Sequence, residues 1–113
     1  MGDRAMANIK TSHGSIYVYT HWRGSELPQI AKSAILAAKP RWGDESYATH
    51  IIIDQLTKDS RDSETGVGIM LVPDHEDAYN HDQPSVIVDL PLRTLIVQGH
   101  EHEDTQVSFS EIE

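Results

Sequence analysis

Residues 8–20 alternate apolar and polar positions in the manner of paired β-strands. The alternation runs from Asn8 toward Ser12, pauses at His13-Gly14 and resumes from Ser15 to Thr20, where β-branched and aromatic residues dominate. Gly14 can adopt the positive φ that a tight reversal requires. The pattern therefore predicts a β-hairpin.

Two stretches with helical periodicity follow the hairpin. Apolar residues recur at three- and four-residue spacing over residues 26–39 and again over residues 44–56. Ser25 is expected to cap the first helix, and Pro40 is expected to stop it. Asp44 is expected to cap the second helix. The sequence thus predicts two consecutive helices joined by a short connection.

The remainder of the chain has strand character. Strands are predicted at residues 67–72, 85–90 and 93–98, and residues 105–110 either add a short edge strand or simply trail. The order β-β-α-α-β-β-β predicts an α+β fold, a two-layer sandwich in which an antiparallel sheet of about five strands carries two helices on one face. The uncovered sheet face and the open sheet edges offer a surface for a homodimer.

Length and composition predict one domain. A chain of 113 residues, 38% of them hydrophobic, suits a single core at residues 8–98. Residues 1–7 are expected to be an expression remnant or a disordered terminus, and residues 99–113 an acidic C-terminal tail. The absence of cysteine excludes disulfides and thiolate chemistry. No apolar run has the length of a membrane span, so we expect no membrane association and a cytoplasmic location.

Several short strings give the sequence a recognisable pattern: Gly14 to Trp22, Glu26-Leu27-Pro28, Arg41-Trp42 with Asp44 and Tyr47, and Glu64 to Ile69. With these strings the chain resembles a family of small uncharacterised bacteriophage and bacterial proteins, over roughly residues 8–97. The resemblance implies a phage or prophage accessory protein that acts in the host cytoplasm, and it implies no particular activity.

Acidic residues are concentrated in the second half of the chain. The net charge of −9 divides into +1 for residues 1–56, with six basic and five acidic residues, and −10 for residues 57–113, with three and thirteen. Such a charge repels nucleic acid and attracts basic surfaces. We therefore favour a non-enzymatic interaction module that binds a basic host protein and blocks a host defence. Seven carboxylates form the candidate face: Asp74, Glu76, Asp77, Asp82, Glu101, Glu103 and Asp104.

The alternative is a small-molecule binding protein or small enzyme that holds a nucleotide or another anionic ligand. An Arg, a Trp and a Gly precede each predicted helix, where unpaired N–H groups attract anions and an indole offers a stacking surface. The opposing interpretation is that the tryptophans pack over the helices and the arginines pair with nearby acids. The candidate ligand residues are His21, Trp22, Arg23, Arg41, Trp42 and Tyr47.

Metal binding and catalysis have weaker support. Four histidines lie beside carboxylates in two acidic segments (His75, His81, His100 and His102), but no HExxH motif or EF-hand spacing is present. No nucleophile-elbow motif occurs, and the histidines weighed as bases, His13 among them, have no recognisable partner pattern. We accordingly predict no cofactor, no metal site and no catalytic residue.

Overall fold

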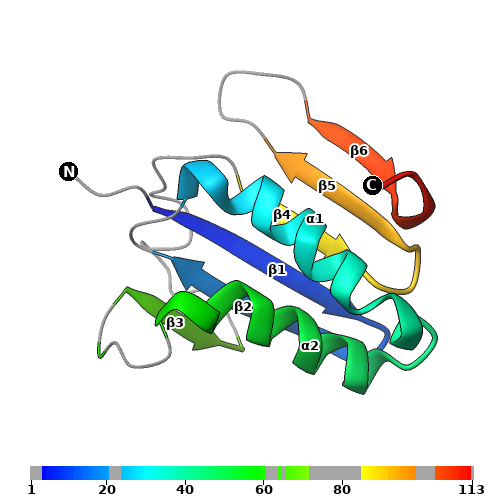
Figure 1. Ribbon diagram of the computed structural model, residues 1–113, viewed down its shortest axis with the longest axis horizontal. Helices are drawn as coiled ribbons and strands as arrows, with labels where there is room; N and C mark the ends of the chain where they lie inside the picture. The colour runs from blue at the N-terminus through cyan, green and yellow to red at the C-terminus, as the bar shows by residue number, and fades with distance from the viewer. Residues whose placement is uncertain are drawn as a thin grey trace.

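A computed structural model describes residues 4–20, 24–60, 64, 66–71, 85–98 and 104–112. It is an α+β fold in which two helices lie side by side across one face of a six-stranded sheet (Figure 1). The α+β class predicted from the sequence is confirmed. Within the described residues, no helix is long and apolar enough to cross a membrane.

The helices and strands occupy the regions that the periodicity indicates. The strands are β1 (Ala5–Thr11), β2 (Gly14–Thr20), β3 (Val67–Met70), β4 (Ser85–Asp89), β5 (Thr94–Gln98) and β6 (Thr105–Ser108). The helices are α1 (Leu27–Ala37) and α2 (Glu45–Thr57). Four short 3₁₀ turns complete the described structure: η1 (Gly24–Glu26), η2 (Lys39–Arg41), η3 (Lys58–Ser60) and η4 (Phe109–Glu111).

The sheet is mixed, which corrects the prediction of a fully antiparallel sheet of about five strands. Its order is β3-β2-β1-β4-β5-β6, and β1 pairs in parallel with β4 from Ala7↔Val86 to Lys10↔Asp89. The other four pairings are antiparallel. Alternation reveals which side chains share a face, but it does not reveal which strand pairs with which or in what direction. After the helices the chain returns beside β2 as β3, and the parallel pair arises because the next strand, β4, lies on the other side of the hairpin beside β1.

Both ends of the described chain take part in the fold. β1 begins at Ala5, so residues 5–7, which were expected to lie outside the domain, form its buried first half. At the other end β6 pairs with β5, so residues 105–108 form an edge strand, one of the two outcomes that the sequence allowed. Phe109, which follows β6, is 1% exposed. The packed domain therefore extends beyond residues 8–98 in both directions.

The core lies between the sheet and the helices. Ala5, Ala7 and Ile9 of β1 and Val86 and Val88 of β4 project toward the helices and are buried. The buried stripes that cover them consist of Leu27, Ala31, Ala34 and Ile35 of α1 and Ala48 and Ile52 of α2. Small alanines at the sheet centre let the helices approach closely, because a pleated sheet and a helix pack by filling the volume between them.

The helix ends differ from the capping expectations in detail. Ser25 lies in η1, and the position before α1 is Glu26, whose side chain makes no cap hydrogen bond. Asp44 precedes α2 in an extended conformation and also lacks a side-chain cap bond. Its carbonyl accepts the first helical bond, from the Ala48 amide at 2.9 Å. α2 thus begins where the sequence predicts, with a polar first turn at the end of the hairpin.

Candidate functional site

Most residues of the two sequence-derived candidate sites lie outside the described residues. These are His21, Trp22 and Arg23 of the ligand-binding candidate and Asp74, Glu76, Asp77, Asp82, Glu101 and Glu103 of the acidic face. Asp104, just before β6, is exposed. The proposed acidic face stays a prediction.

The second half of the ligand-binding candidate divides into an inward and an outward part. The Trp42 indole Nε1 donates a hydrogen bond to the Ile35 carbonyl at 2.8 Å, and its ring lies 5.1 Å from that of Phe109. Trp42 is thus tied into the packing between η2 and the C-terminal turn. The Arg41 guanidinium lies 5.2 Å from the centre of the Tyr47 ring, and both side chains are exposed.

The two helix entrances lie at opposite ends of the helix pair. Figure 1 shows α1 and α2 side by side and running in opposite directions, joined by η2. Antiparallel helices of this kind place their N-terminal ends far from one another. The described part of the first entrance, η1, therefore lies away from Arg41, Trp42 and Tyr47.

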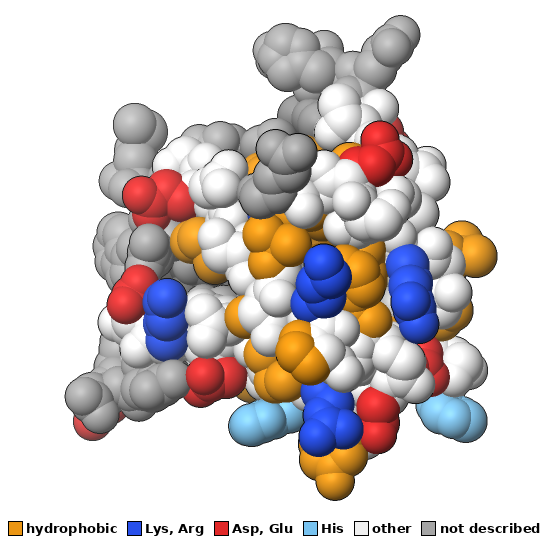
Figure 2. All heavy atoms as spheres, turned by 45° about the vertical axis from the view of Figure 1, so that its right-hand side comes forward, with side chains coloured by type: hydrophobic (Ala, Val, Ile, Leu, Met, Phe, Trp, Pro, Cys, Tyr) orange, Lys and Arg blue, Asp and Glu red, His pale blue; other side chains and the backbone are white. Residues whose placement is uncertain are grey.

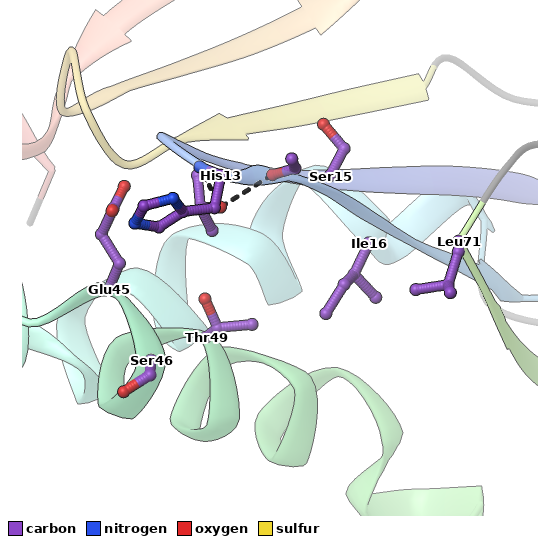
Figure 3. A pocket seen from close by; sticks show the side chains of 9 residues that line it. His13, Ser15, Ile16, Glu45, Ser46, Thr49 and Leu71 are labelled. Atoms are coloured by element: carbon purple, nitrogen blue, oxygen red, sulfur yellow. Dashed lines mark hydrogen bonds between the residues drawn. The ribbon is translucent and has the colours of Figure 1, made fainter.

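A cavity of about 470 Å³ opens between the β1–β2 turn and the first half of α2 (Figure 3). The hairpin forms one wall and α2 forms the other, with Leu71 after β3 at the far end. Its lining residues are Thr11, His13, Gly14, Ser15, Ile16, Glu45, Ser46, Thr49 and Leu71. We refer to this cavity as the turn pocket.

The turn that forms the first wall is held by its own hydrogen bonds. Gly14 has a φ of +141°, a conformation that side-chain-bearing residues rarely adopt. The Thr11 hydroxyl donates to the Gly14 carbonyl at 2.8 Å and accepts the His13 amide at 3.1 Å. These contacts fix His13 at the rim of the turn pocket, where its side chain is exposed.

Glu45 connects the two walls. The Ser12 amide donates to Glu45 Oε2 at 2.8 Å, and the Ser12 hydroxyl donates to Oε1. The hydroxyl and then the amide hydrogen bond from Ser12 hold the pKa of the Glu45 carboxyl below its ordinary value, and the nearby His13 acts in the same direction. Glu45 is therefore an anion at neutral pH.

Thr49 contributes a buried hydroxyl that faces the turn pocket. The residue is 8% exposed, and its Oγ1 finds no hydrogen-bond partner among the described residues. In Figure 3 the hydroxyl oxygen points from α2 toward the β1–β2 turn. Leaving a buried polar group unpaired costs about 1–3 kcal/mol.

Thr57, on the same helix, provides a comparison, because its hydroxyl is hydrogen-bonded. Its hydroxyl donates to the Ile53 carbonyl, four residues earlier, at 2.9 Å. This is the usual local bond of a helical threonine. Three buried side-chain oxygens lack a partner among the described residues, those of Asn8, Thr49 and Thr94, and of these Thr49 alone lines the turn pocket.

The turn pocket combines an apolar body with one polar end. Ile16, Leu71 and the methyl group of Thr49 supply apolar surface, and Glu45 supplies carboxylate oxygens. Neither lysine nor arginine is among the residues described in its lining. This composition suits the binding of a small organic molecule.

A second, smaller cavity of about 210 Å³ lies between α1 and the end of α2. It is lined by Gln29, Ile30, Ser33, Gln55, Leu56, Lys58 and Asp59. None of the buried unpartnered oxygens found in the described residues lines it. It therefore offers less reason to expect a ligand.

Elsewhere the described residues bring no three His, Asp or Glu side chains together in a metal-binding group. The histidines weighed as metal ligands, at positions 75, 81, 100 and 102, lie outside them. Comparison of the chain with family models, with curated proteins and with solved structures gave no match.

Of the residues that line the turn pocket, His13 alone was considered in the sequence as a chemical group. Ser12 and Gly14 are read there only as a turn, and Thr49 falls beside the apolar stripe of a helix. One signal was available. A threonine next to the buried stripe of a helix is a polar group that needs a partner.

Proposed function

We propose that this protein binds a small organic molecule in the turn pocket. The observation that carries the proposal is the buried Thr49 hydroxyl, which faces the pocket and has no partner among the described residues. A ligand group that bonds this oxygen would recover the free energy that the unpaired hydroxyl costs.

The dimensions and lining of the turn pocket support the same proposal. Its volume of about 470 Å³ lies within the range of roughly 300–1,000 Å³ that is usual for ligand pockets. Such pockets are mostly apolar with a few convergent polar groups, as Ile16, Leu71, Glu45 and Thr49 provide here. The Ser12 bonds to Glu45 hold the two walls together before a ligand arrives.

The proposal differs from the sequence-based alternative in place and in ligand charge. That alternative puts an anion beside Arg41 and Trp42, whereas the turn pocket contains the Glu45 carboxylate. Like charges repel one another at short range. A neutral or positively charged molecule is therefore the expected ligand.

A fragment screen followed by two-dimensional ¹H–¹⁵N NMR tests the proposal. We expect binding fragments to shift the amide signals of residues 11–16 and 45–49. Thr49→Val, which keeps the side-chain shape, should weaken binding, whereas Thr57→Val, which removes a hydroxyl bonded within the helix, should not. Shift changes confined to other regions, or a Thr49→Val variant that binds every fragment unchanged, would refute the proposal.

The distribution of charge supports a second candidate, the interaction module that binds a basic host protein. The described residues contain nine acidic and seven basic side chains, and the rest of the chain contains nine and two. On the face shown in Figure 2, Lys and Arg side chains are interspersed with Asp and Glu side chains. The excess negative charge thus belongs to the segments that carry Asp74 to Asp82, Glu101 and Glu103.

A charge-reversal series tests this second candidate. Reversal of Asp74, Glu76 and Asp77 to lysine should release a host protein that the wild type retains, and salt should weaken the wild-type association. Reversal of Glu26, Glu64 and Glu111, which lie in the described body, makes a control of equal charge. Equal loss in both variants would show that net charge alone is responsible and would contradict a docking face.

A further inference from the structure

We infer that the ligand of the turn pocket carries a protonated amine, held between the Glu45 carboxylate and the Thr49 hydroxyl. This inference rests on the proposed function and names the chemical class of its ligand. It follows from the hydrogen-bonding capacity that the pocket leaves unused, from the spacing of the polar groups on α2 and from the charge of the site.

The unused hydrogen-bonding capacity of the polar end consists mainly of acceptors. Each Glu45 oxygen accepts one hydrogen bond from Ser12, while a carboxylate offers about four acceptor sites. The Ser46 hydroxyl donates to Asp44 Oδ1 at 3.2 Å and points away from the turn pocket in Figure 3. The Thr49 oxygen is unpaired. An ammonium group has three donors and no acceptor, so it matches the free acceptor sites of Glu45 and Thr49.

The spacing of these groups also fits a single nitrogen atom. Glu45 and Thr49 are four residues apart on α2, so their side chains lie on one helix face, and both point toward the hairpin in Figure 3. Neighbours of this kind have Cβ atoms about 5–6 Å apart. One ligand nitrogen between the two side chains would bond the carboxylate at about 2.7–2.9 Å, the distance that such charged hydrogen bonds prefer.

The charge of the site favours a cation over an anion, although the pocket lies at a helix N-terminus. The helix dipole places a partial charge of roughly +0.5 there, which by itself attracts anions. Asp44 and Glu45 place two carboxylates at the same end, and Glu45 is ionised because Ser12 stabilises its charged form. Their full charges exceed the dipole, and the net charge of −9 adds a long-range attraction for cations.

The apolar residues that line the turn pocket predict the chemistry of the ligand beyond its amine. Ile16 and Leu71 lie along the wall away from Glu45, and Leu71 is 75% exposed. An exposed leucine beside a cavity provides apolar surface that a bound hydrocarbon or aromatic group would remove from water. The ligand class is thus an aliphatic or aromatic amine with its nitrogen directed toward α2.

Three molecules of one shape test the inference: 2-phenylethylamine, 2-phenylethanol and phenylacetate, which differ in head-group charge. NMR titration should place the amine in the turn pocket with an affinity about tenfold or more above that of the alcohol, because hydrogen bonds to a charged group are the stronger ones. Phenylacetate should show no binding there. Glu45→Gln should reduce the affinity for the amine to that for the alcohol.

Matched variants test whether the loss of amine binding comes from the pocket residues or from removing any carboxylate or hydroxyl. Glu64→Gln removes the same charge from an exposed position away from the pocket and should leave the amine preference intact. Thr49→Val should weaken the amine, and Thr57→Val should not. Retention of an ordinary NMR spectrum in each variant shows that the fold survives.

The outcomes distinguish the inference from the function on which it rests. If the alcohol or phenylacetate occupies the turn pocket as tightly as the amine, the amine assignment is overturned while small-molecule binding stands. If the amine preference persists in Glu45→Gln, the carboxylate does not recognise it and the inference is likewise overturned. If none of the three shifts residues 11–16 or 45–49, the amine class is rejected, and the fragment screen decides the function separately.

Discussion

Ser12, at the tip of the β1–β2 hairpin, donates two hydrogen bonds to the carboxylate of Glu45, 33 residues later in the first turn of α2. One residue thus links the sheet layer to the helical layer at the mouth of the turn pocket. The same bonds set the charge of Glu45, because hydrogen bonds to a carboxylate favour its ionised form.

This link makes stability depend on pH in a definite direction. The pKa of Glu45 is lowered from its ordinary value of 4.5, chiefly by the Ser12 hydroxyl and then by its amide. A carboxyl with a lowered folded-state pKa stabilises the fold fully above its unfolded-state pKa, and that stabilisation is lost as the pH falls through the folded-state pKa. The wild type should therefore exceed Glu45→Gln in stability at neutral pH, and the difference should shrink in acid.

Urea unfolding at a series of pH values from 7 downward measures this difference. Glu64→Gln serves as the control, since it removes an exposed carboxyl away from the hairpin turn. A difference between wild type and Glu45→Gln that is constant across the series, or that grows in acid, would contradict the role assigned to Ser12.

The buried hydroxyl of Thr49 predicts a variant that folds more stably than the wild type. Thr49→Val removes an unpaired buried polar group while it keeps the side-chain shape, so the free energy of unfolding should rise by about 1 kcal/mol. Thr57→Val loses a hydrogen bond to the Ile53 carbonyl and should not be stabilised. Chemical denaturation of both variants tests the pair, and a destabilised Thr49→Val would show that the hydroxyl has a structural partner.

The sequence pattern predicted the helices well because the signal for a helix is local. Recurring apolar positions placed α1 and α2 to within a few residues, even though Ile51-Ile52-Ile53 taken alone would suit a strand. The hairpin was equally local, since Gly14 supplies the required backbone conformation. Pairing between distant strands is not local, and the parallel contact of β1 with β4 left no mark in the alternation of either strand.

The ends of the domain and the turn pocket were missed for related reasons. Ala5 and Ala7 are too small to look like core residues in a sequence, yet they are buried under the helices. Phe109 appears isolated in an acidic tail, and only the structure brings it to Trp42. The turn pocket depends on Thr49 meeting a turn more than thirty residues away, which no local spacing reveals.

Backbone strain at the hairpin tip predicts different outcomes for two glycines. Gly14 has a φ of +141°, and a Cβ there would meet nothing within 4 Å. The cost of Gly14→Ala is therefore conformational rather than steric, and we expect a loss of about 1 kcal/mol or more. Gly68→Ala in β3 is the control, because its Cβ also meets no atom within 4 Å and its φ is ordinary.

Thermal and urea unfolding of the two glycine variants provide the measurement. Gly68→Ala should be close to neutral or slightly stabilising, since alanine restricts the unfolded chain. Gly14→Ala should also weaken ligand binding, because Gly14 belongs to the turn that forms one wall of the turn pocket. Equal stability changes in both variants would show that the turn tolerates a side chain at position 14.

The packing of Phe109 predicts that the acidic C-terminal segment is required for the fold. Its ring is buried against Trp42, and its amide donates to the Arg93 carbonyl at 2.8 Å. Replacing a buried phenylalanine by alanine costs about 3–5 kcal/mol, a large part of the 5–15 kcal/mol that stabilises a domain of this size. Phe109→Ala should therefore lower the urea midpoint sharply. Glu111→Ala, two residues on and exposed, is the control. A Phe109→Ala variant with wild-type stability would mean that the segment after β5 is dispensable.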